Sequence, residues 1–281
     1  MSLPINNNIP SLTGQRSLAA NTKALNNSLT RLSTGLRINR GADDPAGLIA
    51  SENLRAALKV LEAETRAIER ADMVASRADG ALSELSGLFA EAEALAVASA
   101  NTGGMSEAER DANQMQLDSI LQTIDRVART TDFNGDALLD GTAQINVAND
   151  SLSIGSVLPT SLGEVEIDGT TYRLSDVVSG GAGSLSSGSP AVAQQIIAAA
   201  RKEITTLRGE IGAFQKNTLG PAQRANAVAI ENITAAESQI RDTDFASEVA
   251  QLTRAQILSS ANIGALAIAN QNPQNVVRLL A

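Results

Sequence analysis

The stretch AQILSSANIGALAIANQNPQNVV, residues 255–277, contains no Lys, Arg, Asp or Glu, although 19% of the 281 residues in the chain are charged. With the residues just before it, the stretch has the spacing of a helix whose large apolar side chains fall on two faces. They are Val249, Leu252, Ile263 and Leu266 on one face, and Ile257 and Ile268 on the other. A helix that is apolar or neutral on all sides has to be surrounded by other helices. The stretch therefore predicts a C-terminal helix that is covered on more than one side.

The natural partner within the chain is the segment 18–36, in which apolar side chains recur every three or four residues. The recurring positions are Leu18, Thr22, Leu25, Leu29, Leu32 and Leu36. This spacing is typical of a coiled-coil interface, and it predicts that the two terminal helices pair with each other. Gly35, Gly41 and Pro45 interrupt the pattern and indicate a linker near residues 35–45.

One partner helix cannot cover two faces, so we expect neighbouring copies of the same chain to cover the rest. Small residues together with uncharged Asn and Gln allow close approach without the cost of burying a charge. When such contacts do not close on themselves, the product is a helical filament. The residues expected to carry this self-assembly are Leu18, Leu25, Leu29, Leu32, Leu36, Val249, Leu252, Ile257, Ile263, Leu266 and Ile268. In a single copy the terminal helices would lack partners, so we expect them to be disordered or bound to a chaperone.

A role in a membrane is the first alternative. A membrane-spanning helix needs about 20 mostly apolar residues. Here the apolar part stops near Ala269, and Gln and Asn residues interrupt or flank it, so we expect no membrane insertion. The Leu pattern at 18–36, with its basic residues, also fits a membrane-active helical protein such as a translocator. A buried interface between copies explains that pattern better.

The segment after the linker predicts one very long helix. Asp43-Asp44-Pro45 is a helix start, because acids favour the first turn and Pro is tolerated there. A repeat of seven residues follows without a break: Leu54, Leu61, Ile68, Ala75, Leu82 and Phe89, widened by Ala71, Ala78, Leu85 and Ala92. The helix extends to about Ala100, which is roughly 80 Å at 1.5 Å per residue. A turn at 101–106 and a shorter helix at about 106–129 come next.

The middle of the chain changes character. Short strands are predicted at 143–148, 151–157, 163–167 and 171–178, with Asp168-Gly169 as a two-residue hairpin turn. The segment SGGAGSLSSGSP, residues 179–190, is expected to be a flexible loop that faces solvent. Helix returns at Ala191, and Gly220-Pro221 is expected to kink it. The last helix is predicted at roughly 245–270, ending before Pro273.

Composition excludes several kinds of chemistry. The chain has no Cys and no His, which rules out thiolate catalysis, serine–histidine catalysis and Cys/His metal sites. We therefore expect no enzyme activity, no metal and no cofactor.

Residues 1–42 hold five basic residues and no acid, but these charges are far apart and no aromatic side chain lies between them for stacking. Nucleic-acid binding is not expected. The N-terminus MSLPINNNIP lacks the features of a cleavable secretory signal.

Three stretches resemble bacterial flagellin. They are LSTGLRINRGADDPAGLIAS (32–51), IDRVARTTDFNGDALLDG (124–141) and AAESQIRDTDFASEVAQLTRAQILSSANIGALAIANQNPQNVVRLL (235–280). The resemblance implies a filament subunit that is exported unfolded by the flagellar type III apparatus and lies outside the cell in the flagellum. It also implies a chaperone for the C-terminal helix, and contact with the filament cap and hook-associated proteins. The alternative within this group is the hook–filament junction protein, which has related termini.

The fold class expected from these observations is mainly α: an elongated coiled coil or helical bundle built from both termini, with a small β-hairpin region in the middle. Five segments follow from it. They are 1–42, the N-terminal helix of an inner tube domain plus linker; 43–141 and 191–241, the two halves of a helical core; 142–190, the β region and outer loop; and 242–281, the C-terminal helix of the inner tube.

The sequence departs from the flagellin pattern in ways that affect its expected partners. The region between the two helical halves is shorter than in many flagellins. Gly220-Pro221 falls within a helix that is usually continuous in this family. The segment 89–101 resembles the surface that the flagellin-sensing Toll-like receptor recognises in other flagellins. Those flagellins often have Arg at the positions of Glu91 and Glu93, and Glu at the position of Gln116. A weak agonist is therefore expected.

Ser184, Ser186, Ser187 and Ser189 are candidate acceptors for O-glycosylation. Some flagellins carry a zinc protease, but it needs a His-Glu-x-x-His motif, which a chain without His lacks.

Overall fold

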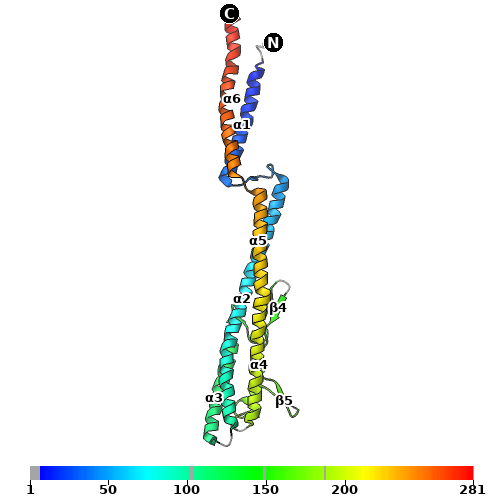
Figure 1. The fold of residues 1–281 in the computed structure, drawn as a ribbon, viewed down its shortest axis with the longest axis vertical. Helices are drawn as coiled ribbons and strands as arrows, with labels where there is room; N and C mark the ends of the chain where they lie inside the picture. Colours follow the sequence, from blue (N-terminus) through cyan, green and yellow to red (C-terminus); the bar gives the residue numbers. More distant parts are fainter. Residues whose placement is uncertain (1–6, 102–103, 148–149, 187, 281) are drawn as a thin grey trace. The chain divides into compact units, whose positions relative to one another are not determined.

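The chain is mainly helical in a computed structural model that describes residues 7–101, 104–147, 150–186 and 188–280 (Figure 1). Its α-helices are α1 (Ile9–Thr34), α2 (Pro45–Ala100), α3 (Glu107–Thr130), α4 (Pro190–Phe214), α5 (Gly220–Arg241) and α6 (Phe245–Leu280). Three antiparallel strand pairs lie between α3 and α4. The expected fold class, mainly α with a small β region in the middle, is confirmed.

The chain divides into two compact units. Residues 1–60 and 229–281 form the first unit, and residues 61–228 form the second. Helices α2 and α5 contribute residues to both. The five-part division made from the sequence stays a prediction.

The repeat of seven residues in α2 forms the buried face of the second unit. From Ile68 onward the buried positions recur every three or four residues: Ile68, Ala71, Ala75, Ala78, Leu82, Leu85, Phe89, Ala92 and Ala96. They belong to one core cluster with the inner faces of α3 and α4. Large side chains alternate with Ala, which lets helices interdigitate at close range. The prediction from the repeat is confirmed there, while Leu54 and Leu61 are only half-buried.

The strand pairs agree in part with the sequence. Strand β3 (Gln144–Val147) pairs with β4 (Asp150–Ser153), and β5 (Val165–Ile167) pairs with β6 (Thr170–Tyr172). Asp168 and Gly169 have φ of 51° and 75°, as a two-residue hairpin turn requires. A third pair, β1 (Asp132–Phe133) with β2 (Asp136–Ala137), lies outside the predicted strands.

The expected strand at 171–178 ends early. Its second half is a 3₁₀-helix, η1 (Leu174–Val177). The Asp176 carboxylate accepts a hydrogen bond of 2.8 Å from the backbone N–H of Arg173, which closes this turn. Leu174 and Val177 are both buried, because side chains three residues apart eclipse each other in a 3₁₀-helix.

The loop after η1 is not solvent-facing at its centre, contrary to the prediction. Ser184 is 0% exposed and Leu185 is 1% exposed. The carboxamide oxygen of buried Gln114 on α3 accepts a hydrogen bond of 2.6 Å from the backbone N–H of Leu185. The other end of the same carboxamide donates to the carbonyl of Val177, at 3.1 Å, and to Asp118, at 2.7 Å. A partner more than sixty residues away thus holds the loop against α3.

The helix that contains Gly220-Pro221 changes its winding instead of breaking. A π-helical segment, η2 (Gln215–Leu219), joins α4 directly to α5. The backbone N–H of Gly220 donates to the carbonyl of Gln215, five residues earlier. A wider turn gives room to the proline ring, which crowds the preceding turn of an α-helix. The Gln215 carboxamide also donates to Asp72 at 2.8 Å and Ser76 at 3.0 Å on α2.

Helix α6 runs past Pro273 to Leu280, so the predicted end near residue 270 is wrong. Pro has no N–H and leaves the carbonyl four residues earlier, that of Ala269, without its helical donor. In this structure the side-chain amide of Asn8 donates to that carbonyl at 2.9 Å. The missing bond is thereby replaced, and the helix continues.

Within the described residues, no helix is long and apolar enough to cross a membrane.

Candidate functional site

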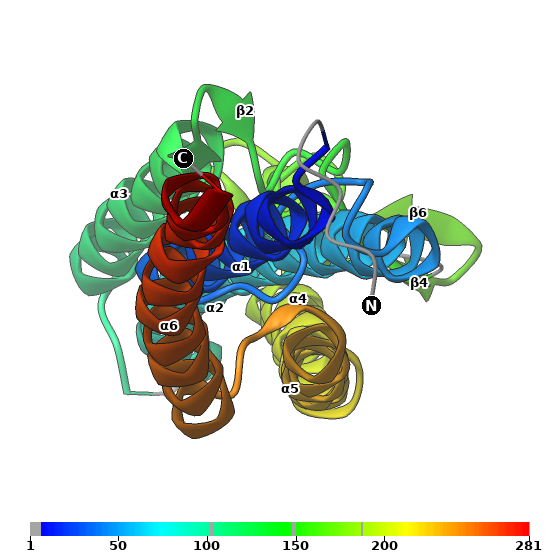
Figure 2. The same ribbon diagram turned by 90° about the horizontal axis from the view of Figure 1, so that it is seen from above.

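The first unit is built around α1 and α6, which lie side by side and run in opposite directions (Figures 1 and 2). Contacts along the pair confirm this direction. Near one end Gly14 packs against Leu266, and near the other Arg31 lies 3.5 Å from the carboxylate of Glu248. A Cβ at Gly14 would meet Leu266 Cδ1 at 3.3 Å, so glycine allows the two helices to approach closely here.

The inner faces of the two helices follow the spacing of a coiled coil. On α1 this series consists of the buried and half-buried positions Ser11, Gly14, Leu18, Asn21, Leu25, Ser28 and Leu32, and Asn27 and Arg31 beside it are half-buried as well. On α6 they are Glu248, Leu252, Ala255, Ser259, Asn262, Leu266 and Ala269. Both series step by three and four residues. Most members are small or polar, so the pair buries little apolar surface against itself.

This interface corrects the one predicted for α1. Leu18, Leu25 and Leu32 face α6, but the positions between them are Asn21 and Ser28 rather than Thr22 and Leu29. Thr22 and Leu29 are exposed. Small and polar residues on the inner face permit the close approach seen at Gly14, which bulkier Leu side chains would prevent. Leu36 lies beyond α1, where its backbone pairs with Asp242.

The outer face of α6 carries most of its large apolar side chains. Between Phe245 and Gln271, where the side chains are described, α6 has eight, and only Leu252 and Leu266 turn toward α1. The other six are exposed over 44% to 63% of their surface: Phe245, Val249, Ile257, Leu258, Ile263 and Ile268. On α1, Ile9, Leu12 and Leu29 are exposed as well. Exposed apolar surface of this extent marks an interaction site.

Backbone hydrogen bonds tie together the two linkers at the end of the helix pair. The N–H of Arg37 donates to the carbonyl of Arg241 at 2.7 Å, and the N–H of Thr243 donates to that of Gly35 at 2.9 Å. Gly35 ends α1 with φ of 73°, a conformation that favours glycine. The Arg241 guanidinium lies 2.9 Å from Glu52 on α2, and this hydrogen bond lowers the pKa of the Glu52 carboxyl.

The Asp43-Asp44 pair begins α2, as predicted. Asp44 Oδ1 accepts a hydrogen bond of 2.9 Å from the N–H of Gly47 in the first turn. Asp43 accepts from the backbone N–H groups of Asn39, at 3.2 Å, and Arg40, at 3.0 Å. These hydrogen bonds hold the pKa of the Asp43 carboxyl below its ordinary value, and the one from Asn39 has the largest effect. The pair is occupied in shaping the linker, and in the described part of the chain no three acidic residues come together as a metal site.

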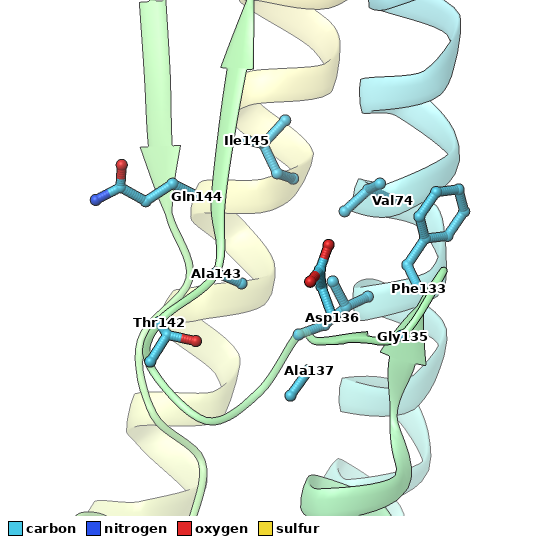
Figure 3. A pocket seen from close by; sticks show the side chains of 10 residues that line it. Val74, Phe133, Gly135, Asp136, Ala137, Thr142, Ala143, Gln144 and Ile145 are labelled. Carbon is cyan, nitrogen blue, oxygen red and sulfur yellow. The ribbon is translucent and has the colours of Figure 1, made fainter.

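The second unit contains a cleft of about 500 Å³ between α2 and the strands (Figure 3). Val74 of α2, Phe133 of β1 and Ile145 of β3 line it, with Asp136 of β2. Of the described residues around the cleft, Asp136 alone is titratable.

The residues predicted to weaken receptor recognition lie on α2 and α3 of the second unit. Glu93 makes an ion pair of 2.9 Å with Arg201 on α4. The Gln116 carboxamide donates to Glu91 at 3.2 Å. Both carboxylates are therefore held by side chains of the same molecule.

The geometry defines a helical protein whose paired terminal helices keep most of their large apolar side chains on the outside. Comparison with known proteins agrees. The model for the bacterial flagellin N-terminal helical region matches residues 5–144, and the model for the bacterial flagellin C-terminal helical region matches residues 194–280. The chain belongs to the bacterial flagellin family.

Individual relatives match over almost their whole length. The flagellar filament 30.7 kDa core protein of Treponema maltophilum is 32% identical, with 99% of each chain covered. The flagellin of Bacillus subtilis (strain 168) is 32% identical over 98% of this chain and 99% of the relative. Among solved structures, the crystal structure of Bacillus cereus flagellin covers 60% of this chain and 88% of its own, with 22% identity and a TM-score of 0.39.

Proposed function

We propose that copies of this chain assemble through the outer faces of α1 and α6. As a member of the flagellin family, the chain is a structural subunit of the bacterial flagellar filament. The observation that supports this route of assembly is the exposure of six of the eight large apolar side chains of α6 between Phe245 and Gln271. Burying such surface between copies is favourable by roughly 25 cal/mol per Å².

The pairing of the terminal helices gives each copy two different outer surfaces, one on α6 and one on α1. Contacts between unlike surfaces of identical copies repeat along an axis and, if they do not close into a ring, form a filament. The linked joint at Arg37 and Arg241 supports this, because it fixes the helix pair to the start of α2. The comparisons lend no support to the hook–filament junction alternative.

Deletion of residues 255–281 tests the assembly route. The truncated protein should stay soluble and largely helical, yet fail to elongate filament seeds. Ile257→Asn and Ile263→Asn should raise the critical concentration for polymerisation, whereas Ile257→Leu, which keeps the apolar surface of this exposed position, should leave it nearly unchanged. Filaments grown from the truncated protein would contradict the proposal, and short rings in place of micrometre-long filaments would favour the junction role.

We further propose that the chain is exported unfolded by the flagellar type III apparatus and resides outside the cell. A chaperone would cover α6 before export, and the filament cap and hook-associated proteins would contact the finished subunit. The support is the exposed face of α6, which in a single copy has no cover. Appearance of the full-length chain in the medium of cells with, but not without, an intact export apparatus is the expected result.

Weak activation of the flagellin-sensing Toll-like receptor is a separate proposal. It is supported by the acidic side chains at Glu91 and Glu93, which a receptor surface built for cations would repel. A reporter-cell assay should show low potency, and Glu91→Arg together with Glu93→Arg should raise it. Full potency of the unmodified chain would contradict this.

Modification of the loop before α4 is restricted by burial. Ser184 is inaccessible, whereas Ser186 is half-buried and Ser189 is exposed. Ser187 lies outside the described residues. We propose that any O-glycosylation in this loop falls on the accessible serines. Peptide mass spectrometry of native filaments should find Ser184 unmodified.

The family is structural. We infer that this chain has a structural rather than a catalytic role, because its family is structural and because a sequence without His and Cys cannot support thiolate or serine–histidine catalysis.

A further inference from the structure

The groove between α1 and α6 contains a cationic notch of about 450 Å³. Its polar lining consists of Asn21, Asn27, Ser28, Arg31, Gln251 and Arg254. We propose that this notch receives the carboxylate of an acidic side chain from a second copy of the chain. The proposal rests on the assembly function above and adds a specific polar contact to it.

Two guanidinium groups make the notch cationic. Arg31 is fixed in place by buried Glu248, whose Oε2 lies 3.5 Å from Arg31 Nη1. Arg254 makes no ion pair with any described residue. Two cations and one acid leave the site with one positive charge in excess. A guanidinium has five donors in a planar fork that matches a carboxylate, so most of the donors at the notch are still available.

The uncharged lining suits the same guest. The carboxamides of Asn21, Asn27 and Gln251 add donors around the two arginines, and Leu258 supplies an apolar wall for the stem of a side chain. A water molecule occupies about 30 Å³ of liquid, so the notch has room for a whole side chain together with bridging waters. Charge-assisted hydrogen bonds from several donors to one carboxylate are among the stronger polar contacts in proteins.

The distribution of charge along the chain identifies the donor of the carboxylate. Residues 1–42 contain no acid, and of the 31 acidic residues in the chain only Glu248 lies outside residues 43–247. Another pair of terminal helices therefore brings mainly further cations to the notch. An acid from residues 43–247 of a neighbouring copy removes the repulsion between adjacent cationic helix pairs, and it selects one register between copies.

A photo-crosslinker in place of Gln251, which is exposed and lines the notch, tests the occupant without removing either arginine. Filaments would be assembled from a mixture of light and isotope-labelled subunits, so that mass spectrometry separates links between copies from links within one copy. We expect links between copies from position 251 to acid-containing peptides of residues 43–247. A crosslinker at Gln256, which does not line the notch, should capture other peptides. Links from position 251 only to α1 or α6 of neighbours would overturn the proposal.

Substitution of Arg254 tests the contribution of the contact. Arg254→Gln should raise the critical concentration about tenfold, the usual effect of losing one charge-assisted hydrogen bond from an interface. Arg254→Lys should recover part of the loss, because it restores the charge but not the planar fork. Arg126→Gln is the matched control: it removes one exposed arginine of α3 that neither lines the notch nor lies on α1 or α6, and it should have little effect.

Two further outcomes separate the possible failures. If the unmodified chain forms no filaments, the proposed function fails. If it forms filaments and Arg254→Gln assembles as well as Arg126→Gln, only the notch contact fails. Polymerisation that depends on phosphate rather than chloride at equal ionic strength, and loses this dependence in Arg254→Gln, would show a free anion in the notch and would overturn the assignment to a second copy.

Discussion

The side-chain amide of Asn8 donates a hydrogen bond of 2.9 Å to the backbone carbonyl of Ala269, 261 positions further along the chain. The other end of the same carboxamide accepts from the backbone N–H of Ser11 at 3.1 Å and caps α1. Ala269 is the residue whose carbonyl loses its helical donor because Pro273 has no N–H. One side chain therefore begins the first helix and replaces a missing bond in the last.

Asn8→Asp separates these two roles. Aspartate keeps the acceptor for Ser11 but has no donor for Ala269, so filaments of this variant should be less stable by about 1–2 kcal/mol per subunit, the cost of an unpaired carbonyl. Pro273→Ala supplies the missing N–H, and in that background Asn8→Asp should cost much less. Thermal depolymerisation of the four proteins in a double-mutant cycle measures the difference. Equal losses in both backgrounds would mean that the two sites are not coupled.

The joint between α1 and α2 should not tolerate a side chain at Gly47. A Cβ there would lie 2.7 Å from Cδ1 of buried Ile38 and would also meet the Asp44 carboxylate that caps α2. Gly47→Ala should therefore lower the free energy of unfolding by roughly 1–3 kcal/mol, the range for overpacking. Gly87→Ala is the control on the same helix, because a Cβ at Gly87 meets nothing within 4 Å.

That control should move in the opposite direction. Replacing an interior helical glycine by alanine stabilises a helix by about 0.5–1 kcal/mol when there is room for the methyl group. Urea unfolding followed by circular dichroism measures both variants. A loss of stability in both would indicate that helix α2 tolerates no added methyl group, and the specific clash at Ile38 would then have no support.

The linker that precedes α2 should loosen in acid. Backbone hydrogen bonds from Asn39 and Arg40 lower the pKa of Asp43. A carboxyl whose pKa is lower in the folded state stabilises that state at pH values above its ordinary pKa, and this contribution is lost as pH falls through the folded pKa. Protection against hydrogen exchange at residues 39–44, taken relative to the intrinsic exchange rate at each pH, should therefore fall below about pH 4, since an ordinary Asp titrates near 3.9.

Asp43→Asn tests the origin of that pH dependence. The variant should exchange faster than the unmodified chain at neutral pH and should show a flatter profile in acid. Glu203 provides the contrast within one molecule. Partial burial raises its pKa, so its ionised form disfavours the folded state, and Glu203→Gln should stabilise the chain at pH values above the ordinary pKa of Glu. A profile for Asp43→Asn that matches the unmodified chain would rule out Asp43 as the cause.

The long helix could be predicted because its core face repeats the same kind of residue at regular intervals. Ile68, Ala75 and Leu82 are each apolar and seven residues apart, and local pattern is enough to place them. The inner face of α1 could not be predicted from the apolar pattern in the same way, because Asn21 and Ser28 on that face are polar. A search for any three-and-four spacing of small residues, rather than of Leu alone, would have found it.

Other features depend on partners that are distant in the sequence. Pattern alone ends a helix near Pro273, and only the position of Asn8 beside Ala269 explains why α6 continues. The Gly- and Ser-rich composition of residues 179–190 favours a mobile loop, yet one buried carboxamide on α3 fixes it. Neither partner can be identified before the helices are placed in space.

That carboxamide gives the last prediction. Gln114→Leu would leave the N–H of Leu185 and the carbonyl of Val177 without their partner inside the core. We expect a loss of about 2–3 kcal/mol in the free energy of unfolding, since each buried polar group left unpaired costs roughly 1–3 kcal/mol. The segment 178–186 should become sensitive to protease, and Ser184 should become accessible to chemical labelling.

Gln116→Ala is the matched control, because Gln116 lies two residues away on the exposed side of α3 and bonds only to Glu91 among the described residues. It should change stability by less than about 0.5 kcal/mol, as is usual for surface substitutions. Limited proteolysis with mass spectrometry locates the first cut in each variant. First cuts outside the loop in Gln114→Leu, with Ser184 still protected, would mean that the Gln114 carboxamide is not what holds the loop in place.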